Sequence, residues 1–96
     1  MKIDLIKNDG ALYIALDGRL DTTTAPELEK ILSENYADAQ TLTINCEKLI
    51  YISSAGLRVL LNAQKKMKGA MKLTNVCELV MEVFEITGFV DILTIE

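Results

Sequence analysis

The feature that most constrains the fold is a change of hydrophobic period near the middle of the chain. Apolar and polar residues alternate over residues 41–46, and the apolar run Leu49-Ile50-Tyr51-Ile52 follows after two charged residues. A period of two is typical of a β-strand. Over residues 54–67 the apolar residues recur at helical spacing and leave a single polar stripe. The sequence therefore predicts a strand that runs directly into an amphipathic helix.

Strand and helix patterns also alternate before this central unit. Two apolar segments, residues 3–6 and 11–16, flank an Asp9-Gly10 pair, which predicts an antiparallel hairpin with a tight turn. A helix is expected next, because Thr24 and Glu27 have the spacing of a capping box and Pro26 suits a first helical turn. Its apolar stripe consists of Leu28, Ile31, Leu32 and Tyr36.

The last third of the chain continues the alternation. Gly69 is a plausible helix stop, residues 71–74 read as a short strand, and residues 78–87 read as a helix that Gly88 closes. The residues expected to point inward from that helix are Leu79, Val80, Val83 and Phe84. Residues 92–95 form either a last strand or part of the terminal packing.

These elements predict an α/β fold. A length of 96 residues cannot divide into two independent cores, so we expect one domain over residues 1–96. The N-terminal hairpin followed by βαβ crossovers implies a mixed sheet of four to five strands, with the helices packed mainly on one face.

Composition excludes several classes of function. The chain has no His and no Trp, which excludes Ser-His-Asp and Cys-His catalysis, histidine phosphorelay and zinc sites that need imidazole. The net charge of −4 opposes binding to nucleic acid or to an anionic membrane surface. There is no apolar run long enough to span a bilayer and no signal peptide at the start, so we expect a cytoplasmic protein.

The two cysteines and the lysine cluster have ordinary explanations. Cys46 and Cys77 form no CxxC motif, and we expect both to be small buried hydrophobes rather than a disulfide or a redox centre. A basic run near the end of the central helix is interpreted as a solvated helix terminus. It comprises Lys65, Lys66, Lys68 and Lys72.

The segment at residues 53–57, Ser-Ser-Ala-Gly-Leu, is the first candidate site. Capping of the helix explains one serine, and we assign it to Ser53. Ser54 then heads the polar stripe, with Ala55 and Gly56 expected to leave its surroundings open. A phosphoryl group there would meet the helix dipole, and Arg58 lies one turn further on. From the residues alone, capping ranks ahead of phosphoryl acceptance, and catalysis by Ser54 ranks last because no base is in evidence.

The second candidate is the polar loop at residues 21–24, Asp-Thr-Thr-Thr. The capping box needs only Thr24, which leaves Asp21 and Thr22 as candidate contacts, although a solvated loop is the more common case. Because loops that leave successive parallel strands gather at one edge of a sheet, we expect Asp21 to lie near Ser54.

Taken together, four motifs resemble the STAS domain of bacterial anti-sigma-factor antagonists, and the resemblance covers essentially the whole chain. They occur in the family's order and spacing at residues 18–21 (Gly-Arg-Leu-Asp), 24–28 (Thr-Ala-Pro-Glu-Leu), 51–57 (Tyr-Ile-Ser-Ser-Ala-Gly-Leu) and 84–88 (Phe-Glu-Ile-Thr-Gly).

The resemblance implies a non-enzymatic partner switch. In this family the unmodified antagonist binds an anti-sigma factor that is also a serine kinase, phosphorylation of one Ser breaks the complex, and a metal-dependent, PP2C-type phosphatase restores it. That Ser corresponds to Ser54, with Ser53 as the second choice. No cofactor is implied, because ATP would belong to the kinase. The expected partner interface consists of Asp21, Thr22, Thr23, Thr24, Ser53, Ala55, Gly56 and Arg58.

Three residues depart from the family pattern. Ser53 replaces the usual Asp, Ala55 replaces a Ser or Thr, and Arg58 replaces a common Gly. With Ser53 the segment lacks the negative charge beside Ser54, and with Ala55 it lacks the second hydroxyl. These two differences keep open an alternative to the partner switch. In that alternative the chain is a STAS scaffold or a transporter accessory subunit that binds constitutively and is never phosphorylated.

Overall fold

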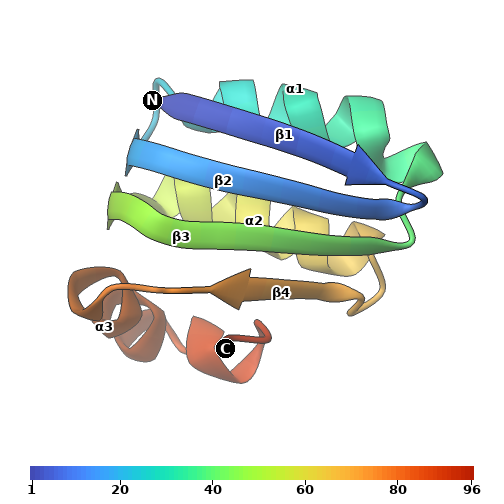
Figure 1. Cartoon of the computed structure of the whole chain (residues 1–96). Coiled ribbons are helices and arrows are strands. Elements are labelled where there is room, and N and C mark those ends of the chain that lie inside the picture. The colour runs from blue at the N-terminus through green and yellow to red at the C-terminus, as the bar shows by residue number, and fades with distance from the viewer.

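The computed structural model describes residues 1–96 and contains one four-stranded mixed sheet. The strands are β1 (Lys2–Asn8), β2 (Ala11–Leu20), β3 (Thr41–Ile52) and β4 (Met71–Thr74), in that spatial order. β1 pairs with β2 antiparallel, whereas β2 with β3 and β3 with β4 are parallel. The predicted hairpin followed by parallel crossovers is confirmed (Figure 1).

The opening hairpin turns at the predicted pair. Asp9 and Gly10 both have positive φ angles, 48° and 89°, as a two-residue hairpin loop requires. β2 is longer than expected, because Asp17 and Gly18 do not end it. Gly18 has a φ of 118°, and the register between β2 and β3 shifts at this point, so the strand continues to Leu20.

Three helices complete the fold: α1 (Ala25–Asn35), α2 (Ser54–Lys66) and α3 (Glu78–Thr87). Short 3-10 turns follow α1 and α3, at Tyr36–Asp38 and Phe89–Asp91. Figure 1 shows α1 and α2 behind the sheet, and α3 beyond the β4 edge beside the end of β3. Helices therefore cover mainly one face, as predicted. α3 has the predicted bounds, and Gly88 closes it in the left-handed conformation, with a φ of 79°.

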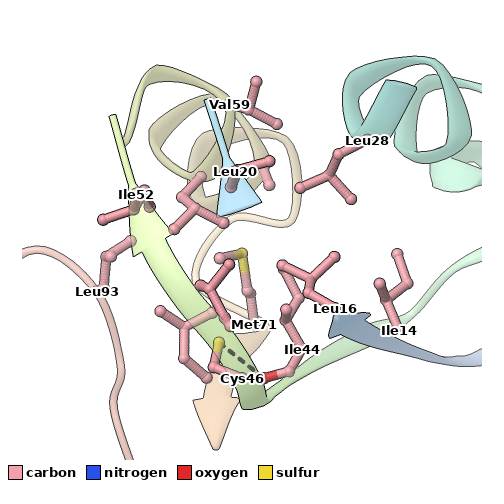
Figure 2. Packing of buried hydrophobic residues seen from close by; sticks show 14 of the residues in the cluster. Ile14, Leu16, Leu20, Leu28, Ile44, Cys46, Ile52, Val59, Met71 and Leu93 are labelled. Carbon is pink, nitrogen blue, oxygen red and sulfur yellow. Dashed lines mark hydrogen bonds between the residues drawn. The ribbon is translucent and has the colours of Figure 1, made fainter. Parts of the chain in front are cut away.

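The core is a single cluster of 22 buried apolar residues between the sheet and the helices. Alternate residues of the central strands supply much of it, for example Ile14 and Leu16 of β2 and Ile44 of β3 (Figure 2). Cys46 is fully buried there, and burial raises the pKa of its thiol to about 12. Cys77 is half-buried, less than expected, and neither cysteine is in a disulfide.

One residue of α3 was placed wrongly by the periodicity. Val80 and Phe84 are buried and Val83 is half-buried, as predicted, but Leu79 is 67% exposed. The buried stripe follows the i, i+4 pair Val80 and Phe84, and Leu79 lies about 100° around the helix from Val80. Its exposure therefore has no explanation in the packing of the core.

The C-terminal segment does not form a fifth strand. Only Ile95 makes an isolated parallel bridge, to Leu73 of β4. Leu93 is buried against the core. Residues 92–95 therefore belong to the terminal packing, which is one of the two options that the sequence left open.

Candidate functional site

The candidate site lies where β2 and β3 end side by side. Leu20 and Ile52 are paired at the ends of these parallel strands, and the backbone N–H of Ser53 donates to the Leu20 carbonyl oxygen at 2.9 Å. The loop after β2 and the start of α2 therefore leave the sheet from neighbouring points at its carboxyl edge (Figure 1). The structure brings the Asp21 loop and the Ser53–Ser54 segment together, as the sequence predicted.

The two serines at the start of α2 have different surroundings. Ser53 is the N-cap, and its hydroxyl oxygen accepts a hydrogen bond from the backbone N–H of Gly56 at 3.4 Å. Ser54 is the first helical residue, and it is exposed. Its hydroxyl makes no hydrogen bond within the chain. The polar stripe continues from Ser54 through the exposed Arg58 and Asn62.

Gly56 lets the first turn of α2 rest directly on the strand ends. A Cβ at this position would lie 2.8 Å from Leu20 Cγ and 2.9 Å from Ile52 Cγ1, which is closer than van der Waals contact allows. Gly56 is consequently buried. Ser54 is exposed as expected. Gly56 is not the reason, because it faces the strand ends and its missing side chain permits close packing beneath the helix.

Asp21, not a capping box, organises the start of α1. The Asp21 Oδ1 atom accepts from the backbone N–H groups of Thr23 and Thr24, at 3.0 and 3.2 Å, and from the Thr23 hydroxyl at 2.8 Å. The Thr24 hydroxyl accepts from the Asp21 N–H and donates to the Arg19 carbonyl oxygen. Thr24 caps no helical N–H group. The predicted box of Thr24 and Glu27 is wrong, because Asp21 takes the Thr24 N–H that the Glu27 side chain would have reached, and the Glu27 N–H donates to the Thr24 carbonyl oxygen instead of its hydroxyl.

These hydrogen bonds also fix the charge of the loop. The pKa of Asp21 is lowered from its ordinary value of 3.8, chiefly because the Thr23 hydroxyl donates to the carboxylate. Asp21 is therefore ionised at neutral pH. The loop beside Ser53 carries the negative charge that Ser53 itself does not supply.

Arg19 is a site residue that sequence reasoning did not single out. Its guanidinium carbon lies 4.1 Å from the centroid of the Tyr51 ring, and its Nε atom lies 4.0 Å from Asp21 Oδ2. The contact with Tyr51 arises because Arg19 pairs with Tyr51 across β2 and β3, after the register shift at Gly18. Gly18 is a sign of an irregular strand, but it does not indicate which residues pair beyond it, so only the structure reveals the pairing.

Thr22, Ala55 and Arg58 line a shallow groove of about 170 Å³ between the starts of α1 and α2. Its other lining residues are Ala25, Pro26, Glu29, Val59 and Asn62. Arg58 is exposed and forms no ion pair within the chain. The hydroxyls of Thr23 and Thr24 are engaged within the loop instead.

Two further properties bear on the chemistry of the chain. No cluster of three or more His, Cys, Asp or Glu side chains is arranged to hold a metal ion. No helix is both long and apolar enough to cross a membrane. The groups that the candidate site offers are the exposed Ser54 hydroxyl, the Asp21 carboxylate held by the loop, and the Arg58 guanidinium, which forms no ion pair.

Comparison with known proteins identifies the family. The model of the STAS domain matches residues 2–96. The chain belongs to the STAS domain family. The resemblance drawn from the four motifs is thereby confirmed over nearly the whole chain.

Curated relatives of this STAS domain carry related names. BtrV of Bordetella bronchiseptica, named as a candidate anti-sigma factor antagonist, is 38% identical over 96 residues, which cover 96% of this chain and 83% of BtrV. The anti-sigma-B factor antagonist of Bacillus subtilis is 30% identical, with 99% and 90% of the two chains covered. Both matches extend over the strands and helices that build the candidate site.

Solved structures confirm the fold. The Bacillus cell fate determinant SpoIIAA in its phosphorylated form superposes with a TM-score of 0.77 over 99% of this chain and 91% of SpoIIAA. The two sequences are 19% identical. The STAS architecture is therefore shared even where the sequences have diverged widely.

Proposed function

We propose that this STAS domain is an anti-sigma-factor antagonist that acts by partner switching. Unphosphorylated, it binds an anti-sigma factor that is also a serine kinase, and phosphorylation of Ser54 releases it. The observation that carries the proposal is the exposed Ser54 hydroxyl, which makes no hydrogen bond within the chain and lies at the first position of α2. The names of the curated relatives support the same role.

The switch has a simple electrostatic basis. A phosphoserine carries about −1.5 to −2 charges at neutral pH. Placed in an interface, that charge must be desolvated, and the ionised Asp21 on the neighbouring loop adds repulsion. Where the interface brings no cation to the phosphate, such a charge costs about 2–5 kcal/mol of binding free energy. A tight complex would thus become a weak one.

The chemistry of modification belongs to the partners. A protein that is only the substrate of a kinase and a phosphatase needs no catalytic base of its own. The absence of His from this chain is compatible with that role. The kinase supplies ATP, and a PP2C-type phosphatase with its metal ions removes the phosphate. The protein itself is a regulatory module that is neither an enzyme nor a holder of a cofactor.

The three serines of the chain allow a sharp test. The protein is incubated with its cognate anti-sigma factor kinase and ATP, and the phosphate is located by mass spectrometry. We expect modification of Ser54, its loss in Ser54→Ala, and its retention in Ser33→Ala and Ser53→Ala. Ser33 is a suitable control because it is an exposed serine on α1 whose hydroxyl donates to the Lys30 carbonyl oxygen.

The same experiment distinguishes the alternative. Ser53 and Ala55, which replace the family's usual Asp and hydroxyl residue, favour a scaffold or transporter accessory subunit that is never phosphorylated. Phosphate incorporation that persists in Ser54→Ala would refute the assignment of the site. A partner that is bound equally by the wild type and by Ser54→Asp, with no incorporation at all, would identify the scaffold.

A further inference from the structure

An apolar groove of about 260 Å³ lies between the end of β3 and α3. Seven of its eight lining residues are hydrophobic. They are Ile50, Tyr51, Ile52, Leu79, Val80, Val83 and Ile86, and Glu82 is the eighth. Ile50 is 59% exposed and Ile86 is 86% exposed. Large apolar side chains gathered at such exposure mark an interaction site more often than they serve the fold.

The groove adjoins the candidate site at the end of β3. Tyr51 forms part of its wall and also holds the Arg19 guanidinium, which reaches Asp21. Ile52 lines the groove and is followed directly by Ser53. A partner that contacts Asp21 and Arg19 is therefore next to the Tyr51 wall of the groove.

The Ser54 side of this surface lacks an anchor for tight binding. The groove between α1 and α2 is small and is lined in part by Thr22, Glu29, Arg58 and Asn62. Stable interfaces bury about 800 Å² on each partner, and much of their binding energy comes from a few apolar or aromatic groups in a central pocket. The apolar groove supplies such groups next to the polar site.

The shape and charge of the groove indicate its occupant. Leu79, Val83 and Ile86 have the i, i+4, i+7 spacing with which one helix packs against another. α3 carries three glutamates, Glu78, Glu82 and Glu85, and no lysine or arginine. A partner helix therefore fits best if its apolar face is flanked by basic residues.

We propose that this groove docks an amphipathic, basic-flanked helix of the anti-sigma factor and anchors the complex that phosphorylation of Ser54 controls. The inference rests on the proposed function. The docked helix contributes affinity, whereas the neighbouring Ser54 decides whether the complex persists.

The proposal is tested by calorimetric titration of the cognate anti-sigma factor with exposed-residue variants. Ile86→Asp and Leu79→Asp should each weaken binding at least about tenfold, which corresponds to about 1.4 kcal/mol. Circular dichroism should show that both variants remain folded, since neither residue is part of the core. The matched control is Ile6→Asp on β1, where an isoleucine is also well exposed, at 63%; its affinity should stay at the wild-type value.

A charge variant tests the chemistry of the partner helix. Glu82→Lys should weaken binding, and the loss should shrink as the salt concentration is raised, because salt screens exposed charges. A Glu82→Lys variant that binds as well as the wild type would contradict a basic-flanked partner.

The outcomes separate this inference from the proposed function. If both Ile86→Asp and Leu79→Asp bind with wild-type affinity, the docking of a helix in the groove is refuted, whereas the proposed partner switch is not affected. Failure of the wild type to bind any anti-sigma factor would refute the proposed function, and the docking proposal with it. A concentration-dependent dimer in sedimentation that Ile86→Asp abolishes would show that a second copy, not the anti-sigma factor, covers the groove.

Discussion

The Asp21 carboxylate both fixes the conformation of its loop and places a negative charge at the candidate site. It accepts hydrogen bonds from the backbone and hydroxyl of Thr23 and from the backbone of Thr24, which fixes the loop before α1. It also keeps a negative charge at the surface we assign to the partner, with Arg19 beside it. The loop geometry and the local charge are thus set by the same atoms.

The pKa of Asp21 gives a direct measure of this arrangement. We expect an NMR titration to place it below 3.8, and Thr23→Val to raise it, because the hydroxyl that most strongly favours the carboxylate is removed. Thr22→Val is the matched control, since Thr22 makes no hydrogen bond to Asp21. An unchanged Asp21 pKa in Thr23→Val would contradict the account.

The sign of the pH dependence follows from the lowered pKa. The ionised Asp21 stabilises the folded state fully above the unfolded value of about 3.8, and this contribution is lost as the pH falls through the lower folded value. Thr23→Val should therefore reduce the difference in unfolding free energy between pH 6 and pH 2. Urea titrations at the two pH values measure this difference.

The close packing of Gly56 against the strand ends leads to a prediction about stability. Gly56→Ala should destabilise the protein by about 1–3 kcal/mol, because the new methyl group overlaps Leu20 and Ile52 at the strand ends. Urea denaturation measures the change. Asn62→Ala, at an exposed position of the same helix, should shift the unfolding free energy by less than about 0.5 kcal/mol. Equal stabilities of Gly56→Ala and the wild type would refute the close packing.

At the scale of the elements, the two serines of α2 should behave differently. Ser53→Ala should cost about 0.5–1 kcal/mol of stability, because its hydroxyl caps the helix through a rather long 3.4 Å hydrogen bond. Ser54→Ala should leave stability within about 0.5 kcal/mol of the wild type, since its exposed hydroxyl has no partner in the chain. Thermal and urea unfolding of both variants measure these two effects. A larger loss of stability in Ser54→Ala than in Ser53→Ala would contradict the assignment of Ser53 as the cap.

α3 offers a contrast between core and surface. Phe84→Ala should destabilise the fold by about 3–5 kcal/mol, because the ring is fully buried. Ile86→Ala, two residues further on, should change the unfolding free energy by less than about 0.5 kcal/mol. A large loss of stability in Ile86→Ala would mean that this residue serves the fold, and would weaken the case for a docking groove.

The sequence predicts the elements well wherever the hydrophobic period is long. The bounds of α3 and the start of α2 at Ser54 agree with the structure, because many side chains contribute to each pattern. The bounds of β4 also agree, although this strand is short. α1 also begins where the sequence predicts, directly after Thr24, but its capping hydrogen bonds were predicted wrongly, because Thr24 with Glu27 and Asp21 with Thr23 are competing local arrangements. Which of them forms depends on small differences in hydrogen bonding that a spacing rule does not contain.

At the scale of the whole molecule, parallel pairing of β2 and β3 creates the site. Asp21 and Ser53 are more than thirty residues apart in the sequence, yet each follows directly on one of the paired strand ends. This proximity was predictable from the βαβ topology. The contact of Arg19 with Tyr51 was not, because it depends on an irregular register at Gly18 that leaves no periodic signal.

The central claim is that one phosphoryl group on Ser54 decides whether the complex forms. The most direct measurement compares the affinity of the cognate anti-sigma factor for unmodified protein and for protein fully phosphorylated at Ser54. The account predicts a loss of at least about thirtyfold, or about 2 kcal/mol, on phosphorylation. Equal affinities for the two forms would contradict it.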